Sequence, residues 1–263
     1  MISIKHLHWA KEFFKNVKAD IITFCAFTCL VPIIIFLNVA NDSNVAWSNG
    51  VQTSLADCYI FASDIITAAL FIVPVAVFLM GHLFKYDFYS NYVLRQTNKY
   101  IMWEKQIYKI FLFAVIWTFI ISFWTYIIGG FFSVAYINWG NYDSQFYYAT
   151  KTIRPKISFF QVLLFFALMT FFRIYIMCMV VQLLAWLTTR KVWGWAAIVA
   201  IGCFDWYYYP WFSIFYGKLS INYRSWCNST DIPVGFLYAV VLLLVIWSAG
   251  FVASNRKEFI NEE

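Results

Sequence analysis

Charged residues are scarce in this chain. They make up 12% of its 263 residues, while hydrophobic residues make up 63%. A soluble domain of this length usually has about 25% charged and 45–50% apolar residues. A soluble fold could not bury this much apolar surface, so we expect lipid to surround much of the chain. The apolar residues form long continuous runs and do not alternate with polar ones, which excludes a transmembrane β-barrel.

Motifs of enzyme sites are also missing from the sequence. It contains no GxxxxGK[ST] phosphate loop and no GxSxG turn, the devices that hold nucleotides and catalytic serines. Its three histidines, His6, His8 and His82, form no metal-ligand spacing, so we expect no metal site. We therefore expect a non-catalytic chain without a cofactor of its own.

The six cysteines include no CxxC pair, and four of them lie inside apolar runs, where a thiol behaves as a small hydrophobic group. Cys58 and Cys227 are expected near the same membrane face, so both a disulfide between them and two free thiols remain open. The net charge of +6 is spread through short loops. That pattern predicts no nucleic-acid partner.

Six apolar segments are long enough to cross a bilayer, which takes roughly 20 residues. They are residues 21–40, 59–84, 107–132, 158–187, 193–215 and 233–253. The sequence therefore predicts one all-α, multi-pass transmembrane domain over residues 1–263. The fifth segment is interrupted at Pro210, and a proline inside a helix removes a backbone donor and breaks it.

Basic residues predict the orientation. With both termini in the cytoplasm, most lysines and arginines lie in segments on that side, as the positive-inside rule requires. The exceptions are Lys218, Arg224 and the cluster of Lys151, Arg154 and Lys156, which this topology places on the outer side.

The residues before the first span have amphipathic spacing. Ile4, Leu7, Phe14 and other apolar residues recur at helical intervals between charged ones. This favours a helix lying flat at the cytoplasmic membrane surface. A plain basic flank that only sets the topology is an equal alternative.

The inside loop between the second and third spans carries a family resemblance. The second span contains Pro74 and is followed by Asp87, and Lys99 and Lys105 lie before the third span. This arrangement resembles the membrane subunit of an ABC-2 type transporter, particularly the small permeases of bacteriocin-immunity and peptide-export systems. The glycine usual after the acidic residue is absent here, and Gln96 stands about where a proline is common.

The resemblance implies that residues 88–102 form a coupling helix that docks onto a separate cytoplasmic ABC ATPase, which binds ATP and Mg. The residues it implies for this contact are Asp87, Phe88, Tyr92, Arg95, Lys99, Trp103 and Lys105. It further implies a second permease copy or paralogue, the bacterial cytoplasmic membrane, and export of a hydrophobic or amphipathic substrate such as an antimicrobial peptide. An ordinary loop that sets the topology is the alternative for this segment.

Two charges fall near the middle of predicted spans, where an isolated charge is costly. Arg173 and Asp205 lie on antiparallel segments at similar depth, so we expect an ion pair between them. An aromatic run follows Asp205, and we expect a re-entrant segment between Tyr209 and Pro233. Tyr207, Tyr208 and Trp211 of the aromatic run line a pathway or belong to an interfacial belt.

Other functional classes remain open from the sequence alone. A polytopic membrane enzyme would need catalytic residues clustered at one membrane face, and the sparse acids and histidines argue against it. A secondary transporter or channel working without ATP usually shows more intramembrane charge or an inverted repeat. A structural or sensory membrane subunit is a further alternative.

Overall fold

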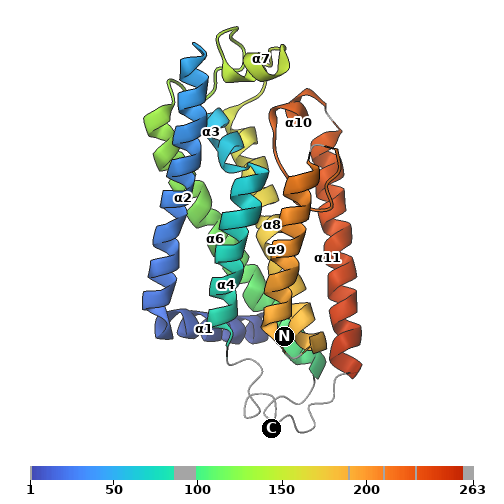
Figure 1. Cartoon of the computed structure of the whole chain (residues 1–263). Coiled ribbons are helices and arrows are strands. Elements are labelled where there is room, and N and C mark those ends of the chain that lie inside the picture. Colours follow the sequence, from blue (N-terminus) through green and yellow to red (C-terminus); the bar gives the residue numbers. More distant parts are fainter. Residues whose placement is uncertain (1, 86–98, 189, 210, 229, 257–263) are drawn as a thin grey trace.

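The structure, a computed structural model, describes residues 2–85, 99–188, 190–209, 211–228 and 230–256 (Figure 1). These residues form helices and loops, with an isolated bridge between Gln52 and Ser144 in place of a sheet. The elements are α1 (Ile2–Ala19), α2 (Ile21–Ser48), α3 (Leu55–Ala62), η1 (Thr67–Ile72), α4 (Val73–Leu83), α6 (Lys99–Phe132), α7 (Gln145–Thr150), α8 (Phe159–Thr188), α9 (Lys191–Tyr208), α10 (Tyr223–Cys227) and α11 (Asp231–Arg256).

The long helices run side by side in one bundle. Figure 1 shows α1 lying across one end, called the α1 end below, while α7 and α10 lie at the opposite end, called the α7 end. Helix α8 is central, because 61% of its most apolar stretch is buried, against 11% in α2 and in α11. The exposed apolar faces of α2 and α11 are what a helix surrounded by lipid presents.

Four helices in the described part of the chain are long and apolar enough to cross a membrane: α2, α6, α8 and α11. A fifth candidate is the pair formed by α3 with the helical stretch Thr67–Leu83, which is bent by 57° at a short break. The six separate spans expected from the sequence are therefore confirmed only as four to five candidates, and the orientation stays a prediction.

The expected fifth span, residues 193–215, is wrong in its extent. Helix α9 ends at Tyr208, and the residues after it form turns, with Pro210 outside the described part. Helix α9 is not among the described helices that are long and apolar enough to cross a membrane. In the expected re-entrant segment between Tyr209 and Pro233, the described residues form turns, the five-residue α10 and the start of α11.

The expected ends of the other spans also move. Helix α6 has 34 residues and begins eight residues before position 107, which makes it about 51 Å long at 1.5 Å per residue. The hydrocarbon core is about 30 Å thick, so α6 must tilt or project from it. The expected second span is broken between α3 and η1, and η1 is a π-helix followed by Pro74.

Candidate functional site

An acidic residue of α1 is held by two lysines of α6. The carboxylate of Glu12 lies 2.5 Å from Lys105 Nζ and 2.9 Å from Lys109 Nζ. The two lysines are four residues apart and so share one face of α6. The Lys109 side chain is completely buried and that of Lys105 is 8% exposed. We call these three residues the Glu12 cluster. It fixes α1 across the first turns of α6.

The Glu12 cluster changes the acidity of its carboxyl group. Burial by itself would raise the pKa of Glu12, because it disfavours the charged form. The hydrogen bonds and positive charges of Lys105 and Lys109 outweigh burial and lower the pKa from 4.5 to about 2. Glu12 is therefore ionised at neutral pH and neutralises part of the charge on the two lysines.

A second ion-pair group lies where α1 passes into α2. Asp20 is the residue between the two helices, and its Oδ1 lies 3.2 Å from Lys85 Nζ and 3.4 Å from His82 Nε2. His82 is in the last turn of α4, and Lys85 follows that helix. Both ends of the inside loop, at Lys85 and at Lys99, are thus attached to helices that contact α1 or its continuation.

Trp103 packs the start of α6 against α8 and α11. Its ring is fully buried and meets the Trp186 ring edge-on, with 6.3 Å between centroids. A Cβ added at Gly250 of α11 would lie 1.9 Å from the Trp103 ring. Only glycine therefore allows α11 to approach this ring so closely.

The residues expected to contact an ATPase divide into two groups. Asp87, Phe88, Tyr92 and Arg95 lie outside the described residues. Lys99, Trp103 and Lys105 all belong to the first two turns of α6. Trp103 and Lys105 are buried inside this chain, so they position α1 and α11 and do not present a surface to a partner. Lys99 is half-buried.

A group of polar residues lies inside the bundle towards the α7 end. The chain leaves helical geometry between α3 and η1, which frees backbone carbonyls that need partners away from water. Arg173 of α8 is buried and donates from Nη1 to the Ser63 carbonyl at 3.0 Å and from Nη2 to the Tyr216 carbonyl at 3.3 Å. The Ser63 hydroxyl accepts from the Ile221 backbone N–H at 3.1 Å.

Asp205 organises the turn that follows α9. Its fully buried carboxylate accepts from the Ser213 hydroxyl at 3.0 Å and from the backbone N–H groups of Ile214 at 2.6 Å and Phe215 at 2.8 Å. The Tyr216 backbone N–H donates to the same carboxylate. Successive N–H groups converging on one carboxylate form an anion-binding nest. We call Ser63, Arg173, Asp205, Ser213 and Tyr216 the polar junction.

The direct ion pair expected between Arg173 and Asp205 is not among the ion pairs within 4.0 Å in the described part of the chain. Tyr216 joins them instead, because its carbonyl accepts from Arg173 and its N–H donates to Asp205. The prediction that both charges lie in one region is correct in this sense. The physical reason for the difference is that the broken helices leave backbone carbonyls and N–H groups that need partners away from water, and each charge bonds to the ones beside it.

The aromatic residues after Asp205 face outwards. Tyr207, Tyr208 and Trp211 are 77%, 45% and 91% exposed. They lie on the outside of this chain, so they could line a pathway only together with lipid or another chain. The choice between pathway and interfacial belt therefore stays a prediction.

Several residues of both groups were missed by sequence reasoning. In the sequence, Glu12 is one of several charged residues of the amphipathic segment, and Lys109 is one of many basic residues on the expected cytoplasmic side. Lys105 and Lys109 lie four residues apart, but nothing in the sequence links them to Glu12, which is 97 positions from Lys109. Ser63 and Tyr216 contribute mainly backbone groups, for which side-chain patterns give no signal.

Cys58 and Cys227 are both free thiols, and Cys58 is buried. Among the described residues no group of three or more His, Cys, Asp or Glu side chains could hold a metal ion. In comparisons with models of protein families, with curated proteins and with solved structures, no match to this chain was found.

Proposed function

We propose that this chain is the membrane-spanning permease subunit of an ATP-driven exporter of the ABC-2 type. Two such subunits, identical or related, would form the pathway in the bacterial cytoplasmic membrane, and separate ATPase subunits would bind ATP and Mg at the α1 end. The substrate class is a hydrophobic or amphipathic molecule such as an antimicrobial peptide. This assignment starts from the loop pattern around Asp87, Lys99 and Lys105.

The observation that carries the proposal is the Glu12 cluster. The loop expected to meet an ATPase continues directly into α6, whose first turns are tied to α1 by Lys105 and Lys109. The other end of the loop is tied to the same helix system through Lys85 and Asp20. Force applied to the loop would therefore move α1, α4 and α6 together, which a coupling element has to achieve.

At the α7 end, the polar junction is the second element of the proposed mechanism. It connects the break between α3 and η1 to the segment after α9 through Arg173. A break and a π-helix are places where a span can change its bend. In the proposed mechanism α4 moves with the loop, and the bend above it opens or closes the pathway. Helix α9 would then serve as the fifth of six spans, short and completed by the turn that Asp205 holds.

Isolation of the full chain from native membranes in a mild detergent tests the proposal. Co-elution of a cytoplasmic ATP-hydrolysing protein, with ATP turnover in the isolated complex, is the expected result. Isolation of an oligomer of this chain alone, without ATP turnover, would contradict it and would favour the ATP-independent transporter or channel.

A further inference from the structure

Three cations lie together at the α7 end, away from the Glu12 cluster. Lys151, Arg154 and Lys156 lie within six residues of one another in the loop between α7 and α8, and all three are exposed. Lys151 Nζ lies 4.9 Å from the centroid of the Tyr148 ring. The positive-inside rule does not explain these residues in the expected topology. These three cations are therefore candidates for a binding site.

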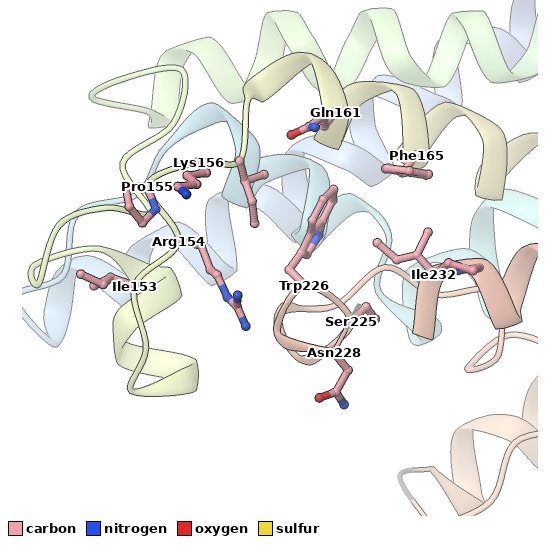
Figure 2. A pocket seen from close by; sticks show the side chains of 12 residues that line it. Ile153, Arg154, Pro155, Lys156, Gln161, Phe165, Ser225, Trp226, Asn228 and Ile232 are labelled. Carbon is pink, nitrogen blue, oxygen red and sulfur yellow. The ribbon is translucent and has the colours of Figure 1, made fainter. Parts of the chain in front are cut away.

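Arg154 and Lys156 border a pocket of about 480 Å³. Its walls come from the 153–157 loop, the first turns of α8, the short α10 and the start of α11. Figure 2 shows Trp226 in the middle of this pocket, with Arg154 and Lys156 on the loop to one side and Ile232 on the other. The volume is in the range of small-molecule sites.

The pocket has an apolar part and a cationic part. Ile157, Phe165, Trp226 and Ile232 provide apolar walls, and the Trp226 and Phe165 rings are 5.8 Å apart. The buried Trp226 indole N–H has no hydrogen-bond partner within the described part of the chain. A ligand with an apolar body and an anionic end would match both parts.

The position of the pocket agrees with a ligand at the membrane surface. Helices α8 and α11 are candidate spans, and they begin at Phe159 and Asp231. Phe165 and Ile232 lie within their first two turns, so the apolar walls adjoin the hydrocarbon while the cations lie outside it. This places the two parts at the depths of a lipid's acyl chain and of its phosphate.

Charge favours an anion at the outer rim. Arg154 Nη2 donates to the Cys227 carbonyl at 2.8 Å, which leaves other guanidinium donors to face a ligand. The neighbouring carboxylate, Asp231, accepts from Asn228 and does not line the pocket. Arg154 and Lys156 therefore border the opening, and no carboxylate is among the described residues that line it.

We infer that this pocket binds an anionic phospholipid of the adjoining leaflet, with its phosphate at Arg154 and Lys156 and an acyl chain along Phe165, Trp226 and Ile232. A bound lipid would join the 153–157 loop to α8, α10 and α11. It would also explain the basic residues of this loop, which the positive-inside rule does not explain. The inference depends on membrane insertion and not on the proposed partnership with an ATPase.

Native mass spectrometry of the purified full chain tests this inference. The chain is incubated with phosphatidylglycerol or with phosphatidylcholine of the same acyl chains, and the retained lipid is counted. We expect phosphatidylglycerol to be retained roughly tenfold more strongly, since each surface cation contributes to binding an anionic lipid. The R154A/K156A double variant should lose this preference, and K156A alone, which breaks no described hydrogen bond, should weaken it.

The matched control is K218A/R224A, which removes two exposed cations of the same end that do not line the pocket. It should retain phosphatidylglycerol like the unaltered chain. Equal retention of the two lipids, or equal losses in both double variants, would overturn the inference. Displacement of the lipid by free glycerol phosphate at similar concentration would also overturn it, because the apolar walls would then contribute nothing.

Discussion

Lys109 Nζ lies 2.9 Å from Glu12 Oε1, although the two residues are separated by 97 positions in the chain. The Lys109 side chain is completely buried, and the same carboxylate also holds Lys105. One acid of an amphipathic helix thus pairs with two lysines of a candidate span and neutralises part of their charge. This contact holds α1 against α6 together with the rings of His6 and Trp9, which pack on Tyr108.

Glu12→Gln removes the negative charge and leaves Lys105 and Lys109 without it. Breaking a buried ion pair on one side costs about 3–5 kcal/mol, and we expect a loss near the lower value because Glu12 is partly exposed. Thermal unfolding in detergent measures this. Lys11→Gln changes an exposed charge one position earlier and should have little effect. Equal melting temperatures of the two variants would count against the cluster.

The pKa of Glu12 predicts an acid-sensitive contact. It is about 2 in the folded chain and 4.5 in the absence of the fold. Because the folded value is the lower one, ionised Glu12 stabilises the chain above about pH 4.5, and this contribution is lost as the pH falls towards 2. The unaltered chain should lose stability over this interval more steeply than Glu12→Gln. Parallel pH profiles for the two proteins would refute the assignment.

Gly250→Ala tests the contact between α11 and the start of α6. The added Cβ would overlap the buried Trp103 ring, and overpacking typically costs about 1–3 kcal/mol. Gly130→Ala is the matched control, since nothing lies within 4 Å of a Cβ there and alanine favours a helix over glycine by about 1 kcal/mol. Thermal unfolding should therefore separate the two variants in opposite directions. A neutral Gly250→Ala would show that the helices lie further apart.

Asp205→Ala tests the polar junction, because it leaves three backbone N–H groups and the Ser213 hydroxyl without their acceptor. Each unpaired buried group costs about 1–3 kcal/mol. We expect strong destabilisation and faster proteolysis within residues 211–222. Asp205→Asn keeps one acceptor oxygen, so its stability should lie between that of Asp205→Ala and that of the unaltered chain. Asp143→Asn changes an exposed carboxylate and should be cleaved by the protease at the same rate as the unaltered chain. If Asp205→Ala were also cleaved at that rate, the result would contradict this account.

The long helices follow from hydropathy, since the runs that became α2, α6, α8 and α11 are continuous and apolar. The break after α3 could not be predicted in the same way, because the run through residues 59–84 is mostly apolar and Asp64 is its only Asp, Glu, Lys or Arg. The end of α9 depends on Asp205 capturing backbone groups of residues 214–216, a tertiary contact that local sequence does not encode.

The candidate site was predictable in part. Arg173 and Asp205 were expected at similar depth on antiparallel spans, and Tyr216 bonds to both of them. The partners of each charge are mostly backbone atoms exposed by the broken helices. Trp103 and Lys105 were identified as important from a family pattern, yet the structure gives them partners inside the chain. A pattern marks a position; the burial of its side chain decides whether that position faces a partner.

ATP turnover by the isolated complex tests the central claim most directly. Asp87→Ala together with Tyr92→Ala removes two side chains of the expected ATPase contact, and Lys218→Ala serves as a control at the α7 end. The account predicts that the double variant loses both the associated ATPase and its turnover, while Lys218→Ala keeps them. Unchanged association and unchanged turnover in the double variant would contradict it.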